Sequence, residues 1–295
     1  MSIGIGINAW VWQSPFTRES ARLIEHAAKM GFDAFTVPVE SPELIDVDAI
    51  RAVQADFPLR LYVSGAFSHD RDLTHADASV RQNALNYIRR TLAICEQLGV
   101  GHLVGPAYSA TGKRRKIPQQ QRAREWELAV AGLSQAGRMA ADHGVVLGIE
   151  PLNRFETDLI NTSTQVKQLI SDIDLPSVRI HLDTFHMHIE ERSVYDAIRV
   201  AGKDLVYVDA SESDRGTPGK GQVHWHEVVR ALRDIDYQGD CIIESFTPEC
   251  ESIADAAAIW RPLASSQDAL AKGGIEFLQQ LLSEPMIRDT PDHQL

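Results

Sequence analysis

Short apolar segments alternate with longer segments of helical periodicity along most of the chain. The apolar segments, which we expect to be strands, span residues 3–8, 33–38, 59–65, 102–106, 145–150, 178–183, 205–209 and 241–245. Each is a continuous apolar run rather than an alternation of apolar and polar positions. Such runs are typical of parallel strands that are buried on both faces of the sheet.

A segment with helical periodicity follows each expected strand. These segments span about residues 19–31, 46–57, 76–98, 119–143, 162–173, 193–202, 226–235 and 252–282. Several end at a glycine, the residue that favours a helix C-terminus: Gly31, Gly99, Gly144 and Gly202. Eight βα units in alternation predict an α/β fold, a single (β/α)8 TIM barrel over residues 1–282, with a doubly wound open sheet as the alternative. The polar residues 283–295 are expected to form a flexible tail.

Composition and charge limit the class of protein. The chain has 295 residues, of which 44% are hydrophobic and 24% charged, which suits one large globular domain. A formal net charge of -12 argues against nucleic-acid binding, because such a surface repels phosphates. No GxGxxG or Walker pattern follows an expected strand, which argues against a nucleotide site. No run of about 18 apolar residues is present, so we expect no contact with a membrane through a spanning segment.

The cysteines and the N-terminal sequence bear on localisation. Cys95, Cys241 and Cys250 are an odd number without CxxC spacing, and the first two lie in apolar segments. Reduced, buried thiols in a cytoplasmic protein are the simplest interpretation. The N-terminal residues MSIGIGINAWVWQ have neither a basic region nor a long apolar region, so we expect no signal peptide.

One basic run, Lys113 to Lys116, interrupts the generally acidic sequence. Runs of exposed charge are common in loops, so a solvated loop is the simpler interpretation. The alternative is a surface that attracts an anionic substrate, for example a phosphorylated one.

Carboxylates end each of the last four expected strands. These are Glu150, Asp183, Asp209 and Glu244. A single acidic residue at a strand end is usually a helix N-cap or half of an ion pair. Four in consecutive strands would meet at the C-terminal end of a barrel, where like charges repel and some would have to stay protonated. A divalent cation with oxygen ligands, such as Mg²⁺ or Mn²⁺, removes this repulsion, so the pattern predicts a metal site.

The loops after these strands supply further polar groups. His186 follows Asp183 by three residues, Arg215 lies in a Gly-rich loop, and Glu156 follows Glu150 by six residues. An isolated loop histidine is more often structural than catalytic. After the first expected strand, either Trp10 or Trp12 could line one side of the pocket, and core packing is an equally good interpretation of each. Gly65 ends the third expected strand. We take Trp12 and Gly65 as the pocket-lining positions.

Four segments carry a resemblance to a known family: GIEPLNRFETDLINT, HLDTFHMHIEE, SESDRGTPGKG and IESFTPE. They resemble the ketose 3-epimerases, the family of D-tagatose 3-epimerase and D-psicose (D-allulose) 3-epimerase within the xylose isomerase-like barrels. The resemblance runs from the first expected strand to about Leu282. It implies a divalent metal ion, Mn²⁺ before Mg²⁺ or Co²⁺, and a homodimer or homotetramer that acts on a small sugar.

The resemblance also implies roles for individual residues. By match with the motifs, Glu150, Asp183, position 209 and Glu244 hold the metal, and Glu156, His186 and Arg215 bind the sugar around O1 to O3. Position 209 departs from the pattern, because the family has a histidine there and this chain has Asp209. An aspartate can still bind a divalent cation, but the four predicted metal ligands then include no nitrogen atom. His181 or His224 could supply the nitrogen ligand instead, and the sequence favours neither.

Epimerisation at C3 of a ketose requires loss of the proton next to the carbonyl and its return on the opposite face. A Lewis-acidic metal ion would stabilise the developing cis-enediolate. Two carboxylates on opposite faces would exchange the roles of base and acid, and we expect these to be Glu150 and Glu244.

Three alternatives remain open at this point. The first is a related enzyme that acts on a keto-inositol, a 3-ketoglycoside or a C-glycoside. The second is an aldose–ketose isomerase, which would form an aldose product. The third is a binding or regulatory barrel with impaired catalysis, which is favoured by one feature, Asp209 in place of the metal histidine.

Overall fold

Eight parallel strands close into a barrel in the computed structural model, which describes residues 3–285. Each strand pairs with the next in the chain, and the last pairs with the first. The strands are β1 (Gly4–Asn8), β2 (Ala34–Val39), β3 (Arg60–Gly65), β4 (His102–Gly105), β5 (Val146–Ile149), β6 (Val178–Asp183), β7 (Leu205–Asp209) and β8 (Asp240–Ile243). The predicted barrel is confirmed, and each strand lies within two residues of its expected bounds.

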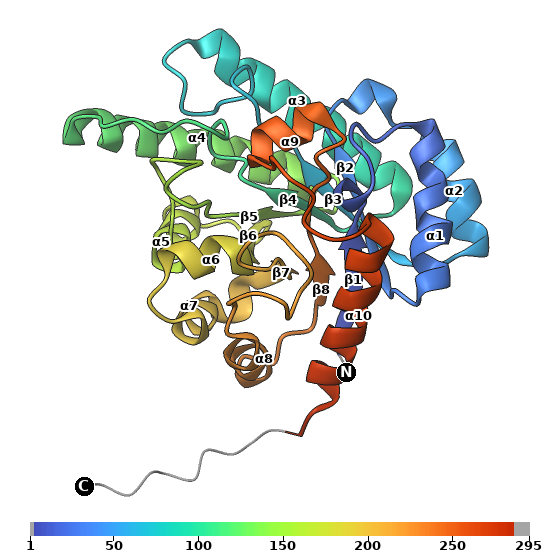
Figure 1. The fold of residues 1–295 in the computed structure, drawn as a ribbon. Coiled ribbons are helices and arrows are strands. Elements are labelled where there is room, and N and C mark those ends of the chain that lie inside the picture. The colour runs from blue at the N-terminus through green and yellow to red at the C-terminus, as the bar shows by residue number, and fades with distance from the viewer. Residues whose placement is uncertain (1–2, 286–295) are drawn as a thin grey trace, which may run out of the picture.

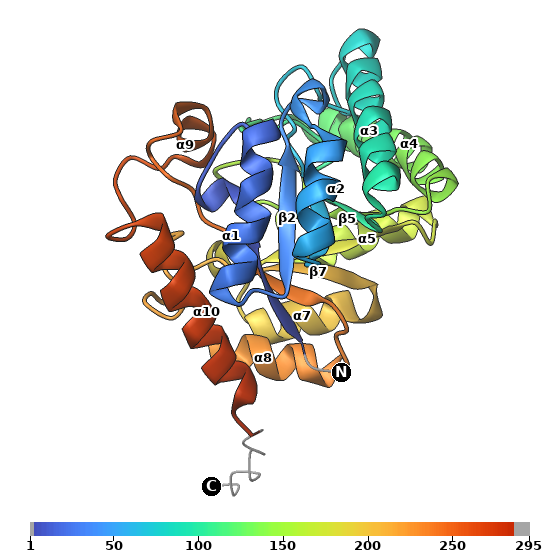
Figure 2. The same ribbon diagram turned by 90° about the vertical axis from the view of Figure 1, so that its right-hand side faces the viewer.

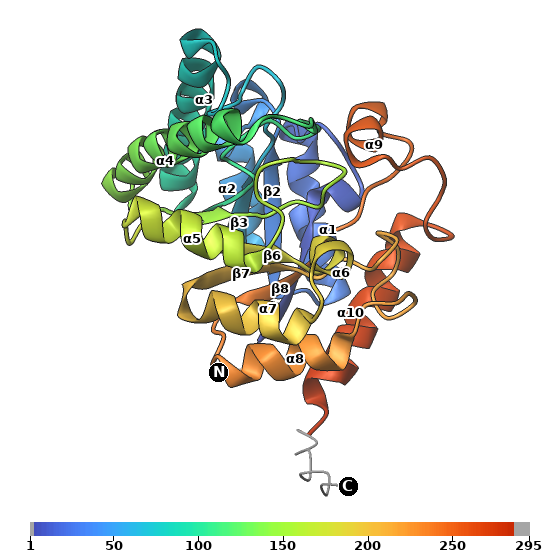
Figure 3. The same cartoon turned by 90° about the vertical axis from the view of Figure 1, so that its left-hand side faces the viewer.

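Helices surround the strands, as Figures 1 and 3 show. They are α1 (Arg22–Met30), α2 (Val47–Asp56), α3 (Ala78–Leu98), α4 (Gln119–Asp142), α5 (Ser163–Ile173), α6 (Thr184–Glu190), α7 (Val194–Ala201), α8 (Trp225–Asp234), α9 (Glu251–Ala257) and α10 (Gln267–Ser283). Gly31 and Gly99 follow α1 and α3 with φ of 92° and 68°, the left-handed conformation that favours glycine at a helix end.

Two helical predictions were incomplete. The segment after β6 was expected to be a loop, but it forms α6, because the Asp183 side chain accepts a hydrogen bond from the Phe185 N–H and caps the helix. The region 252–282 was expected to be one helix. It is divided because Ala258 adopts φ of 54° at the end of α9, and Ser266 caps a new helix, α10. Figure 2 shows α9 at one end of the barrel and α10 along its outside.

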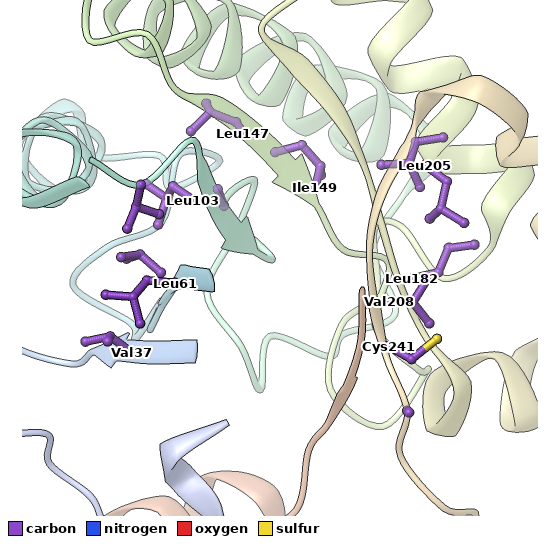
Figure 4. Close-up of a cluster of buried hydrophobic side chains, with 14 of the residues drawn as sticks. Val37, Leu61, Leu103, Leu147, Ile149, Leu182, Leu205, Val208 and Cys241 are labelled. Atoms are coloured by element: carbon purple, nitrogen blue, oxygen red, sulfur yellow. The ribbon is translucent and has the colours of Figure 1, made fainter. Parts of the chain in front are cut away.

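The hydrophobic core has two layers. The outer layer lies between the strands and the helices, where side chains such as Val37, Leu61, Leu103 and Leu147 point away from the barrel axis (Figure 4). The inner layer fills the barrel itself and consists of Ala34, Tyr62, Val104, Tyr207 and Ile242. Because these side chains fill the interior, the barrel is a packed core and not a pore. A ligand can therefore bind only at the ends of the strands.

The thiols and the ends of the chain are in part as expected. Cys95 and Cys241 are free and buried, which confirms the expected burial of these two thiols, whereas Cys250 is only half-buried. Among residues 3–285, no helix has the length and apolar character needed to cross a membrane. The expected tail begins within α10, whose last residue is Ser283, and from residue 286 onward it lies outside the described residues.

Candidate functional site

Strand register brings the four predicted carboxylates to one end of the barrel. Asp183 and Asp209 are the last residues of β6 and β7 and are direct partners in the parallel ladder. Asp209 in turn pairs with Ile242 on β8, so Glu244, two residues further on, points to the same side of that strand. Glu150 directly follows β5, and its N–H donates to the carbonyl of Gly105 on β4. All four lie at the C-terminal ends of their strands, as predicted.

Burial and mutual repulsion act together on these carboxylates, whose exposed fractions are only 1–7%. Burial first, and then the charges of Glu244, Asp183 and Asp209, raise the pKa of Glu150 well above its usual value. Burial and Asp183 do the same to the pKa of Asp209. For Glu244, burial and Asp209 raise the pKa. Desolvation and like charge each disfavour the ionised form, so this cluster attracts either protons or cations.

Arg215 is the guanidinium that lies among these carboxylates. Its Nη1 donates to Asp183 Oδ2 and to Glu244 Oε2, both at 2.7 Å. Burial alone would lower the pKa of Arg215, but these two carboxylates raise it overall. The aromatic rings of Phe185 and Phe246 lie 4.1 Å and 5.0 Å from its guanidinium carbon. The positive charge of Arg215 therefore balances part of the buried negative charge of these carboxylates.

His186 lies on α6 beside the same carboxylates. Its Nδ1 accepts from the backbone N–H of Asn153 at 3.0 Å, which assigns the ring proton to Nε2. Nε2 faces Glu150 Oε1 at 3.6 Å and Asp183 Oδ2 at 3.7 Å. Burial lowers the pKa of His186 to about 3, so it is a neutral donor at physiological pH. Asn153 also donates to Glu156 Oε1 at 2.8 Å, which connects this predicted sugar-binding residue to the cluster.

The structure separates the two histidines that could supply a nitrogen ligand. His181 is buried, and its Nε2 lies 2.7 Å from Asp209 Oδ2. His224 is exposed at the start of α8. Of the two, only His181 is in contact with the carboxylate cluster.

The arrangement of donors fits a divalent cation. Three overlapping groups have ligand atoms within 4.8 Å of one another: Glu150, His181 and Asp209; Glu150, Asp183 and His186; and Asp183, Asp209 and Glu244. Within residues 3–285, His181 Nδ1 and Asp209 Oδ1 are buried without a hydrogen-bond partner. Asp209 Oδ1 is a carboxylate oxygen in a site rich in such oxygens, which is the donor chemistry that hard cations take. His181 Nδ1 lies 3.6 Å from Glu150 Oε2. The residues therefore could hold a metal ion.

A residue that the sequence analysis missed, Glu212, fixes the loop that carries Arg215. Its carboxylate accepts hydrogen bonds from the N–H groups of Ser213, Gly219 and Val223 and from the indole of Trp225, at 2.8–3.0 Å. Hydrogen bonds of this kind favour the ionised form, and the pKa of Glu212 is lowered although burial opposes this. The anchored loop holds Arg215 at φ of 62°, a strained value for a non-glycine residue.

We expect Glu212→Gln to lower the free energy of unfolding by about 1.5–3 kcal/mol. All four partners of the carboxylate are donors, so the amide NH2 of glutamine would face another N–H group. Urea unfolding measures the effect, and Glu249→Gln at an exposed position provides the matched control. Equal stability of the two variants would contradict the anchoring role.

Trp12, one of the two predicted pocket-lining residues, lies against α10 and α1. The Trp12 indole donates to Asp268 Oδ1 at 2.8 Å and packs edge-on against His26, on α10 and α1. Trp10 instead packs against Phe246, 5.7 Å between ring centroids, next to Arg215. Trp10 is therefore the tryptophan that borders the carboxylate cluster through Phe246. The role of Trp12 in sugar binding stays a prediction.

Gly65 ends β3, where a Cβ would lie 2.8 Å from the Phe67 ring and 3.3 Å from the Tyr87 hydroxyl. This close packing explains why glycine occupies the position. Whether Gly65 also contacts a sugar stays a prediction.

The basic run forms ion pairs. Lys113 Nζ lies 2.7 Å from Asp72, and Arg115 lies 2.7 Å from Glu125 and 3.0 Å from Asp158. Acidic neighbours thus balance two of the four positive charges, which weakens the case for an anionic substrate. In the same loop, the Gly112 N–H donates to the carbonyl of Glu156, so the loop supports the segment that carries this residue.

Comparison with known proteins agrees with this geometry. A family model described as "Xylose isomerase-like TIM barrel" matches residues 24–281. The D-psicose 3-epimerase of Agrobacterium fabrum is 34% identical over 266 residues, which are 89% of this chain and 92% of that protein. The chain belongs to the ketose 3-epimerase family of the xylose isomerase-like TIM barrels. This membership makes it an isomerase-class sugar epimerase, as the sequence predicted.

Other members of the family are similar over nearly the same length. The L-ribulose 3-epimerase of Mesorhizobium japonicum is 32% identical and covers 93% of this chain and 92% of its own length. A D-allulose 3-epimerase from Methylomonas sp. superposes with a TM-score of 0.89 at 31% identity, covering 95% of this chain and 98% of that one. A 3-dehydro-D-guloside 4-epimerase of Escherichia coli is more distant, 27% identical over 79% of this chain and 89% of that protein.

Proposed function

We propose that the chain is a metal-dependent ketose 3-epimerase that exchanges the proton at C3 of a free ketose through a cis-enediolate. The observation that supports this most directly is the convergence of four buried carboxylates, Arg215 and His186 at the open end of the barrel. D-psicose, D-tagatose, D-fructose and L-ribulose are the substrate class, a choice that rests on the names of the similar epimerases and on the sugars in their solved structures.

Glu150, Asp183, Asp209 and Glu244 would hold the cation, with Mn²⁺ as the first candidate and Mg²⁺ or Co²⁺ as alternatives. Bound there, the cation supplies Lewis-acid stabilisation for negative charge that develops on the oxygen atoms of the sugar. The near-complete set of oxygen donors favours a hard cation.

Glu150 and Glu244 transfer the proton in this proposal. They follow β5 and β8 respectively, and burial raises the pKa of each carboxyl, which makes its protonated form easier to reach. One carboxylate removes the C3 proton, and the other returns a proton to the opposite face of the planar enediolate.

The remaining polar groups hold the sugar. Arg215 Nη2 lies 3.3 Å from His186 Nε2. Because His186 Nδ1 accepts from Asn153, Nε2–H is also a donor and does not accept from Arg215, so both groups can donate to substrate oxygen atoms. Glu156 would bind the O1 end. Phe185, Phe246 and Trp10 provide an apolar wall that excludes water from these hydrogen bonds.

A metal-replete assay on a panel of sugars tests the proposal. Free ketoses should be epimerised at C3, with the product stereochemistry read by NMR. The alternative is a 3-keto-glycoside epimerase, and it is kept because of the likeness to the 4-epimerase from Escherichia coli. Turnover of 3-keto-sugars alone would favour this alternative, and an aldose product would indicate an isomerase.

We expect Mn²⁺ to raise the melting temperature, and to raise it more near pH 8 than near pH 5.5. A ligand at about 100 times its Kd stabilises the fold by about 2.7 kcal/mol, which is about 5–10 °C for a chain of this size. Protons compete with the cation because the pKa values of Glu150, Asp209 and Glu244 are raised, so affinity falls as the pH is lowered. Thermal melts with Mn²⁺ or EDTA at both pH values measure this, and an equal shift at both would contradict it.

The cytoplasmic location and the homodimer or homotetramer remain predictions from the sequence. Size-exclusion chromatography with light scattering tests the assembly.

A further inference from the structure

The buried pair of His181 and Asp209 lies within the carboxylate cluster, and the proton transfers described above give His181 no role. His181 Nε2 lies 2.7 Å from Asp209 Oδ2, and each residue is 2% exposed. The two belong to neighbouring strands, β6 and β7. A buried polar side chain beside a candidate cation site requires a physical reason, because its desolvation is costly.

Local backbone structure places His181 at this position. The ladder between β6 and β7 shifts register between Ile180 and His181, an irregularity that re-aims the following side chains. On the other side, a Cβ at Gly148 of β5 would lie 3.3 Å from the His181 Cβ, so glycine leaves room for the ring. The ring of Tyr207 packs edge-on against the imidazole, with centroids 4.7 Å apart. The imidazole is therefore held between the Tyr207 ring and the Asp209 carboxylate.

The hydrogen bond determines which atoms remain available. Asp209 binds a cation only in its ionised form, in which it accepts hydrogen bonds. A neutral imidazole carries one ring proton, so in that state Nε2–H donates to Asp209 Oδ2. Nδ1 of His181 then carries no proton and lies 3.6 Å from Glu150 Oε2. Neither Nδ1 nor Oδ1 of Asp209 has a hydrogen-bond partner among the residues the structure describes. An oxygen of Asp209 lies within 4.8 Å of oxygens of Asp183 and Glu244. A cation between these oxygens would satisfy Oδ1.

We propose that His181 is a positioning residue for the cation site, which orients Asp209 by occupying Oδ2 so that Oδ1 faces the cation. This inference rests on the proposed function, because it requires that a divalent cation binds. In many metal sites, a carboxylate outside the coordination sphere orients a histidine ligand. Here the roles are reversed, and a histidine outside the coordination sphere orients a carboxylate ligand.

Three variants of His181 test the proposal by Mn²⁺ affinity, measured from the EPR signal of free Mn²⁺. The amide nitrogen of His181→Gln reaches the position of Nε2 and can donate to Asp209, so affinity should stay within about threefold of the parent protein. His181→Asn places its amide near Nδ1 and cannot reach Asp209, and His181→Met has no donor. Both should weaken Mn²⁺ binding by about 10–100-fold, the usual effect of losing an outer partner of a metal ligand.

The outcomes distinguish this role from its rivals. If His181→Asn binds Mn²⁺ well and His181→Gln does not, then Nδ1 is itself a ligand and the proposal is wrong. Equal affinity in all variants, with only their melting temperatures changed, would make His181 a purely structural residue and would also overturn it. Failure of the parent protein to bind Mn²⁺ would overturn the proposed function and this inference together.

A measurement on the unaltered protein covers the case in which the variants do not fold. The ¹⁵N shifts of the His181 ring should show the proton on Nε2 both with and without diamagnetic Mg²⁺. A proton on Nδ1, or coordination of Nδ1 on adding the ion, would overturn the proposal.

Discussion

Glu150→Gln and Glu244→Gln should each lower kcat by at least about 10²–10⁴-fold, the usual contribution of general acid–base catalysis. Each substitution removes a group that transfers a proton and also a candidate metal ligand. The fold should survive, because glutamine has the same shape and the raised pKa values show that these carboxylates are costly to ionise where they lie.

Steady-state kinetics on the best ketose measures the loss, and Mn²⁺ affinity measured in parallel separates the two roles. Glu249→Gln is the matched control, because Glu249 is exposed in the loop that follows Glu244. If either cluster variant keeps more than about a tenth of the parent activity at saturating metal, that glutamate is neither the acid nor the base.

Asp209→His should raise the affinity for Co²⁺ relative to Mg²⁺ by about tenfold or more, which corresponds to about 1.4 kcal/mol. Imidazole nitrogen suits Co²⁺, whereas oxygen donors suit Mg²⁺. The substitution also removes a negative charge that raises the pKa of Glu150 and of Glu244. A base must be ionised to work, so the acidic limb of the pH–rate profile should move to lower pH.

Asp209→Asn separates the two parts of this prediction. It removes the charge without adding a nitrogen donor, so it should move the acidic limb but leave the preference between Co²⁺ and Mg²⁺ nearly unchanged. Metal titrations of both variants give the ratio. An unchanged ratio in Asp209→His would mean that Asp209 is not a ligand.

The barrel and its carboxylates were predictable because their signals are local and repeated. Each strand is a continuous apolar run, and Glu150, Asp183, Asp209 and Glu244 end such runs in four consecutive βα units. Parallel strands in a barrel end at the same face, so the position of these residues along the chain already fixes their position in space.

The remaining parts of the site depend on contacts between distant segments. The pairing of His181 with Asp209 follows from a register shift between β6 and β7, which no pattern in either strand announces. Glu212 acts by accepting hydrogen bonds from residues up to Trp225, so its role appears only when the loop is folded back on it. Trp12 and Trp10 differ in their surroundings because of the turn after β1, which the apolar pattern does not resolve.

The helix α6 was missed for a related reason. Asp183 ends a strand, caps the following helix through Oδ1 and binds Arg215 through Oδ2. Its carboxylate therefore serves both the fold and the site. A sequence pattern identifies the aspartate, but only the structure shows which of its two oxygen atoms makes each contact.

The most direct test of the central claim is a reaction in D2O with the Mn²⁺-loaded protein and a free ketose such as D-fructose or D-psicose. Proton exchange through carboxylates predicts that the product, epimeric at C3, carries solvent deuterium at C3 and at no other carbon, as read by ¹H and ¹³C NMR. Epimeric product without deuterium at C3, or an aldose product with deuterium at C2, would contradict the account.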